Sequence, residues 1–207
     1  DAKTALGWLE KIPAKEHVQA YDRDELFLSI YKTLDDHERL EEVSWRIFRR
    51  HRTEDTLVAL VDVIGSDQRE QVIEEEARLI LQDEFISYTN ANFLIQINRL
   101  TEAEVYLLNR RDQLDGDLYT SLLPLAEQLE IKGRFLAASV AYRALLESIL
   151  SRANSKYYRH GVRYLKKLDM LAKKCDDWQD VLSHDDYFQD LQQTHGRKKS
   201  FWSRYAE

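Results

Sequence analysis

Amphipathic segments separated by very short connections constrain the fold of this chain more than any other feature. TEDTLVALVDVIG begins at Thr53, a residue type that caps helices, and ends at Gly65, where the chain can turn left-handed. DQREQVIEEEARLILQD follows after one residue, and TEAEVYLLNR places Thr101 and Glu104 at the spacing of a reciprocal N-terminal cap. Helices that stop and restart within so few residues pack as antiparallel pairs.

The scarcity of turn residues supports the same interpretation. Only 6 Gly and 2 Pro occur in 207 residues, whereas a sheet needs many tight turns that depend on glycine. The long segments are rich in Leu, Ala, Glu, Arg and Gln, which are helix formers. The sequence therefore predicts an all-α protein.

One segment carries a repeat pattern, LAEQLEIKGRFLAASVAYRALLESIL, residues 125–150. Ala126 and Ala138 are small enough to let two helices approach closely, Gly133 occupies the turn between them, and Phe135 and Tyr142 recur at helical spacing. This order of small residue, turn glycine, aromatic, alanine and aromatic resembles the tetratricopeptide repeat. The departure from the pattern is Pro124, which predicts a kink in the first helix or a late start to it.

Weaker copies of this pattern precede residue 125, and Asn98 stands where Gly133 stands because asparagine also tolerates a left-handed turn. The resemblance implies one right-handed α-solenoid of about five helical hairpins over residues 1–207. Its acidic repeat array would cover residues 1–150, and basic capping helices would cover residues 151–207. Chance periodicity in an ordinary helical bundle is the alternative.

The charge of the chain is divided unevenly between these two segments. Residues 1–150 carry 18 basic and 29 acidic side chains, a balance of -11, whereas residues 151–207 carry 12 and 8, a balance of +4. On the helix expected around residues 158–175, basic residues recur every three or four positions opposite an apolar stripe, and only Asp169 interrupts them. They form either a solubilising face or a surface that binds an acidic partner.

The end of the chain, THGRKKSFW, extends this basic character. Gly196 is expected to stop a helix in a left-handed turn, after which Phe201 and Trp202 would fold back and cover the last helices. The basic triplet between these points would then lie beside the basic helix. We predict partner binding at seven residues, called the basic ridge: Arg159, Arg163, Lys166, Lys167, Arg197, Lys198 and Lys199.

A second resemblance covers residues 137–202. AYRALLESILSRANSKYYRHGVRYLKKLDML, followed by HDDYFQDLQQTHGRKKSFW, is similar to the C-terminal part of a bacterial protein family of unknown function. Related helical regions follow SWIM-type zinc fingers in some bacterial proteins. The resemblance implies no activity, and since this chain lacks the cysteines of such a finger, a module of that kind would lie upstream of Asp1.

No motif for catalysis or cofactor binding is present in the sequence. The six glycines are isolated, which excludes a P-loop, a dinucleotide-binding GxGxxG and a GxSxG elbow. His184 and His195 could share a helix face with Asp185 nearby, but such residues on a charged helix are usually solvated, so we predict no metal site and no cofactor. Cys175 ends an apolar stripe and is expected to be a core residue.

These observations favour a non-enzymatic module that binds a protein or peptide. The surface where tetratricopeptide arrays hold a C-terminal carboxylate would carry Thr120, Leu123 and Glu127, which does not support such a clamp. The alternatives are a nucleic-acid-associated domain that uses the basic ridge and an enzyme with a dispersed site.

The setting of the chain is inferred from three further features. A single cysteine suits a reducing compartment and no apolar run approaches the ~18 residues of a membrane span, so we expect a cytoplasmic protein without membrane contact. The start at Asp1 and the lone Met170 indicate a fragment or a processed product.

Overall fold

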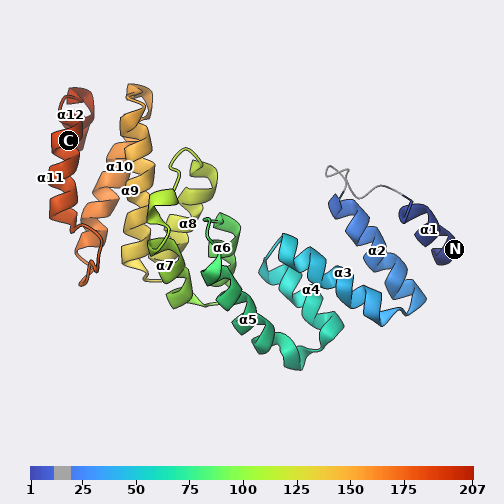
Figure 1. Ribbon diagram of the computed structural model, residues 1–207. Helices are drawn as coiled ribbons and strands as arrows, with labels where there is room; N and C mark the ends of the chain where they lie inside the picture. Colours follow the sequence, from blue (N-terminus) through green and yellow to red (C-terminus); the bar gives the residue numbers. More distant parts are fainter. Residues whose placement is uncertain (12–19) are drawn as a thin grey trace. The chain divides into compact units, whose positions relative to one another are not determined.

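Helices account for all the regular secondary structure that the computed structural model describes, over residues 1–11 and 20–207 (Figure 1). The all-α prediction is confirmed, and no strand occurs in these two ranges. Within them, no helix is long and apolar enough to cross a membrane. The chain divides into two units, Asp1–Arg78 and Leu79–Glu207. Residues 12–19, which belong to the predicted acidic array, lie outside the described residues.

The first unit is built from successive helices that pack on their neighbours. It holds α1 (Ala2–Leu9), α2 (Ala20–Leu34), α3 (His37–Arg50), α4 (Glu54–Ile64) and the short η2 (Ser66–Gln68). α2 packs against α1 and α3, and α3 packs against α4. α5 (Arg69–Gln82) begins in this unit and ends in the second.

The expected ends of α4 are present in the first unit. Thr53 caps α4, with its hydroxyl accepting from the Thr56 amide at 3.1 Å, while the Thr56 hydroxyl accepts from the Thr53 amide. Gly65 ends α4 with a φ of +110°, a conformation that favours glycine. The core includes Phe27 and Tyr31, whose stacked rings lie 5.6 Å apart.

The second unit contains the remaining helices. They are α6 (Tyr88–Gln96), α7 (Leu100–Leu108), η3 (Arg111–Gln113), α8 (Tyr119–Ile131), α9 (Phe135–Ser151), η4 (Ser155–Tyr157), α10 (Tyr158–Ala172), α11 (His184–His195) and α12 (Lys199–Ala206). α9 packs against α7, α8 and α10, so it lies at the centre of this unit.

The hairpin of α8 and α9 has the expected packing. Ala126, Leu129, Ala138 and Tyr142 are all buried, and the two helices pack together. Gly133 and Asn98 both adopt positive φ, at +74° and +60°, as predicted for the two equivalent turns. Pro124 lies inside α8, which begins at Tyr119 and therefore does not start late.

Two sequence-based expectations about helix ends are wrong. Thr101 does not cap α7, which already begins at Leu100; instead Thr101 and Glu104 both accept hydrogen bonds from Arg134, each at 3.2 Å. Gly196 is right-handed, with a φ of -58°. Its lack of a side chain matters for another reason, because a Cβ there would lie 2.5 Å from the Gln192 carbonyl oxygen.

The C-terminal aromatics fold back as expected. Phe201 is fully buried, and its ring meets the Tyr158 ring edge-on at 5.7 Å. Near the other end of α12, the Tyr205 hydroxyl donates to Asp169 at 2.8 Å. Because Tyr158 opens α10 and Asp169 lies near its end, α12 runs parallel to α10 and both helices begin at the same end of this unit (Figure 1).

Candidate binding surface

Three residues of the basic ridge form one exposed row on α10. Arg159, Arg163 and Lys166 follow one another at intervals of four and three residues, which places them on one helix face. All three are exposed, whereas Tyr158, Leu165 and Leu168 turn their side chains into the core. The row extends for about 10 Å at 1.5 Å per residue.

Lys167 has a different environment from these three residues. Its side chain is only partly exposed, and its ammonium group lies 3.0 Å from the Glu130 carboxylate of α8. Glu130 also accepts a hydrogen bond from the Tyr142 hydroxyl at 3.3 Å. Lys167 therefore ties α10 to α8 and contributes little free charge to the surface.

The C-terminal triplet lies near the end of α10 where that helix begins. Arg197 and Lys199 are exposed, Lys198 is partly buried, and α12 starts at Lys199. Since α10 and α12 are parallel and begin at the same end, the triplet lies at the end of α10 that carries Arg159 (Figure 1). Arg163 and Lys166 follow about one and two helical turns further along.

Six of the seven residues of the basic ridge have no ion-pair partner in the described part of the chain. Lys167 alone forms an ion pair with another described residue. The Arg159 guanidinium instead donates to Nε2 of His160 at 3.2 Å, and the Arg163 guanidinium lies 5.5 Å from the centre of the Tyr164 ring. Burial, together with the positive charges of Arg159 and Arg163, lowers the pKa of His160. The surface is therefore electropositive and open to an anionic partner.

Comparison with known proteins gives a family but no activity. A family model described as a family of unknown function (DUF6880) matches residues 1–204. The chain belongs to the DUF6880 family. No curated protein and no solved structure matches the chain.

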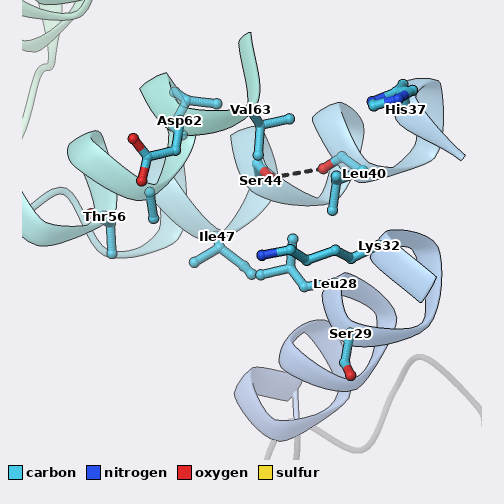
Figure 2. Close-up of a pocket in the computed structure, with 12 residues that line it drawn as sticks. Leu28, Ser29, Lys32, His37, Leu40, Ser44, Ile47, Thr56, Asp62 and Val63 are labelled. Atoms are coloured by element: carbon cyan, nitrogen blue, oxygen red, sulfur yellow. Dashed lines mark hydrogen bonds between the residues drawn. The ribbon is translucent and has the colours of Figure 1, made fainter. Parts of the chain in front are cut away.

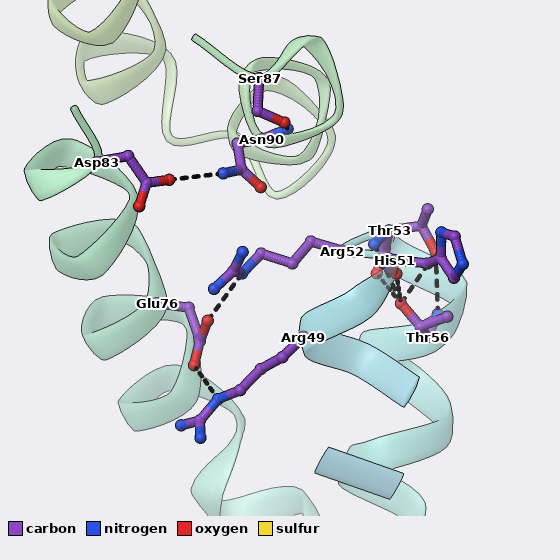
Figure 3. Close-up of polar contacts among 9 residues, drawn as sticks. All are labelled: Arg49, His51, Arg52, Thr53, Thr56, Glu76, Asp83, Ser87 and Asn90. Atoms are coloured by element: carbon purple, nitrogen blue, oxygen red, sulfur yellow. Dashed lines mark hydrogen bonds and ion pairs between the residues drawn. The ribbon is translucent and has the colours of Figure 1, made fainter. Parts of the chain in front are cut away.

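Four arginines of the first unit of this DUF6880 protein have a different role. Glu76, which is 0 % exposed, accepts from Arg49 at 3.0 Å and from Arg52 at 2.8 Å (Figure 3). Asp24 is also buried and pairs with Arg46 at 3.0 Å and with Arg50 at 2.6 Å. Removing one partner from a buried pair leaves an uncompensated charge, so these arginines are held as structural links.

The sequence-based interpretation missed this network, although a signal was present. WRIFRRHR, residues 45–52, is strongly basic within the otherwise acidic first 150 residues. The two acidic partners lie 22 to 27 positions away along the chain, so their assignment required the tertiary structure. In the second unit, Asp83 accepts from Asn90 at 2.8 Å, and Ser87 caps α6 (Figure 3).

A cavity of about 410 Å³ lies in the first unit, between α2, α3 and α4 (Figure 2). Its walls include the apolar residues Leu28, Leu40 and Ile47, with Lys32 and Asp62 as charged residues. The Ser44 hydroxyl, which also lines it, donates to the Leu40 carbonyl oxygen at 2.8 Å. Among these lining residues, no two titratable side chains form an ion pair or a hydrogen bond with each other.

The two histidines of α11 are not solvated, contrary to expectation. Nε2 of His184 lies 2.9 Å from Asp169, and Nε2 of the buried His195 lies 3.0 Å from Glu147. Each carboxylate also accepts from a tyrosine, Asp169 from Tyr205 at 2.8 Å and Glu147 from Tyr187 at 3.1 Å.

Packing around these two pairs accounts for their arrangement. Burial and the hydrogen bond to Asp169 raise the pKa of Tyr205 to about 12, and burial followed by the Glu147 charge raises the pKa of Tyr187. Because both oxygens of each carboxylate accept a hydrogen bond, the pairs fasten α11 to α9 and α10.

Among the described residues, no group of three or more histidine, cysteine or acidic side chains could hold a metal ion.

Arg143 is a buried cation without a carboxylate partner among the described residues. Its guanidinium lies 4.3 Å from the Tyr187 ring centre and 4.8 Å from that of Trp178, and it donates to the Leu182 carbonyl oxygen at 2.8 Å. Burial lowers its pKa to about 10. These contacts anchor the connection between α10 and α11. Cys175, in the same connection, is partly buried and packs against the core cluster of Leu108, Leu136 and Val140.

Proposed function

We propose that this DUF6880 protein is a non-enzymatic interaction module that binds an acidic protein or peptide through its basic ridge. The observation that carries the proposal is the contrast between two sets of basic residues. The buried carboxylates of Asp24 and Glu76 each pair with two arginines of the first unit, whereas Arg159, Arg163 and Lys166 have no acidic partner among the described residues. Uncompensated charge on a structured surface attracts and steers an oppositely charged partner.

The proposal includes an architecture in which the helical hairpins form a right-handed, tetratricopeptide-like solenoid. It is supported by the buried alanines of the α8–α9 hairpin and by the left-handed turns at Asn98 and Gly133, which are 35 positions apart. A reducing, cytoplasmic setting is proposed from the single Cys175.

Titration at several salt concentrations tests the proposed function. A labelled peptide of alternating Asp and Glu is titrated with the wild-type chain and with a triple variant, Arg159→Gln, Arg163→Gln and Lys166→Gln. A control variant loses the same charge at three exposed lysines elsewhere, Lys3→Gln, Lys32→Gln and Lys132→Gln. We expect wild-type affinity to fall as salt rises, the triple variant to bind weakly with a flatter dependence, and the control to bind like the wild type.

Two outcomes contradict this proposal. Equal weakening by both triple variants would assign the binding to net charge rather than to the basic ridge. The second outcome is a single-stranded oligonucleotide that binds much more tightly than the peptide. If the slope of log K against log salt concentration also becomes shallower by roughly 0.7 for each basic residue removed, the basic ridge would be assigned to nucleic acid.

A further inference from the structure

A cavity of about 360 Å³ adjoins the basic ridge between α8, α9 and the start of α10. Arg163 belongs to both, since it lies in the exposed row and also lines the cavity. Leu123, Leu145 and Ile149 contribute apolar surface to the cavity. The cavity therefore joins an apolar lining to an edge of the electropositive surface.

One wall of the cavity is held in place by the connection between α7 and α8. Gly116 is buried there so closely against α9 that a Cβ would lie 2.2 Å from the Ala144 carbonyl oxygen. The next residue, Asp117, accepts from the Ser148 hydroxyl and pairs with Arg152 at 3.4 Å. Because these two bonds reach α9 and the residue that follows it, this wall is formed before any ligand arrives, which lowers the entropic cost of binding.

Aromatic and polar groups complete the lining of the cavity. Tyr119 and Tyr157 both line the cavity, and their large side chains are 60 % and 43 % exposed. His160 accepts from Arg159 through Nε2, which leaves its Nδ1 to carry the proton and to donate. Asp117 already offsets Arg152, so Arg163 is the cation of the lining without an acidic partner among the described residues.

Resting on the proposed function, we propose that this cavity receives one large apolar side chain of an acidic peptide while a neighbouring carboxylate of that peptide pairs with Arg163. An apolar anchor in a preformed pocket with a charged rim is the usual arrangement of a binding hot spot. The apolar surface of Leu123, Leu145 and Ile149 suits an apolar side chain and offers no partner for a row of phosphates, which favours a peptide over a nucleic acid.

Two labelled peptides separate the role of the cavity from that of the charge. One is EDEDFDEDE, and the other replaces its phenylalanine with serine, so that their charges are the same. We expect the wild-type chain to bind the phenylalanine peptide at least about tenfold more tightly. The reason is that transferring a phenyl ring from water into an apolar site lowers the dissociation constant by about a factor of ten or more.

Three single variants then locate the anchor. Tyr119→Ala removes an exposed wall of the cavity and should abolish the preference for phenylalanine while leaving the serine peptide's affinity unchanged. Arg163→Gln should weaken both peptides and reduce the preference. Lys166→Gln, the matched control one turn along the same helix, should weaken both peptides equally and keep their ratio.

The possible failures are distinguishable from one another. Equal affinity of the wild type for the two peptides would overturn the cavity inference and leave the proposed function standing. Absence of salt-sensitive binding to either peptide would overturn both. A preference for phenylalanine that persists in Tyr119→Ala and Arg163→Gln would place the apolar anchor elsewhere and overturn the inference.

Discussion

Replacing Phe201 with alanine should release α12 from α10. Phe201 is the buried residue of this eight-residue helix, and its ring contacts those of Tyr158 and Trp202 at 5.7 and 5.1 Å. Gly161 makes room for it, since a Cβ at that position would lie 3.1 Å from the Phe201 ring. Isolated helices of this length are unstable in water, so α12 depends on tertiary contacts such as this one for its structure.

The expected cost follows from the burial of this ring. Removing a fully buried phenylalanine loses its transfer free energy, about 1.5–3 kcal/mol. The space that the missing ring would leave adds to this loss, so replacing a buried phenylalanine with alanine usually destabilises a protein by about 3–5 kcal/mol in all. Urea denaturation should show this loss in the transition that includes the second unit, and hydrogen exchange should show lost protection in α12.

A control and a binding measurement complete this test. Ser203→Ala, at an exposed position of the same helix, should change stability by less than about 0.5 kcal/mol. If α12 displays the Arg197–Lys199 triplet beside α10, Phe201→Ala should also weaken acidic-peptide binding. A cost below about 1 kcal/mol with unchanged exchange in α12 would refute the reasoning.

Three further predictions concern packing, metal dependence and titration. Ala138→Leu should overpack the interface of α8 and α9 and cost about 1–3 kcal/mol in urea denaturation, and a neutral effect would contradict the close approach there. Treatment with a chelator should leave the melting temperature unchanged, and a large fall would indicate a metal that the histidines of α11 hold. His160 should titrate below the ordinary histidine pKa in an NMR experiment, and Arg163→Gln should raise its pKa because one of two nearby positive charges is lost. Since the folded state disfavours protonated His160, its contribution to stability is complete above about pH 6.5 and is lost as the pH falls through the depressed pKa.

Local sequence signals were sufficient to predict the helices and several of the residues at which they begin or end. The cap at Thr53, the positive φ of Gly65 and the equivalent turns at Asn98 and Gly133 were predicted because each depends on residues within a few positions. The burial of Ala138 was predicted for a similar reason, since helical periodicity alone determines which side chains share a face.

The partners of the charged side chains were decided by the tertiary structure. Thr101 and Glu104 have the spacing of a cap, but Arg134, about 30 positions later, binds them both. Lys167 has the spacing of an exposed residue of the basic ridge, but Glu130 lies 3.0 Å from it. Sequence spacing places a charge on a helix face, whereas its neutralisation depends on which distant helix packs there, and only the folded chain contains that information.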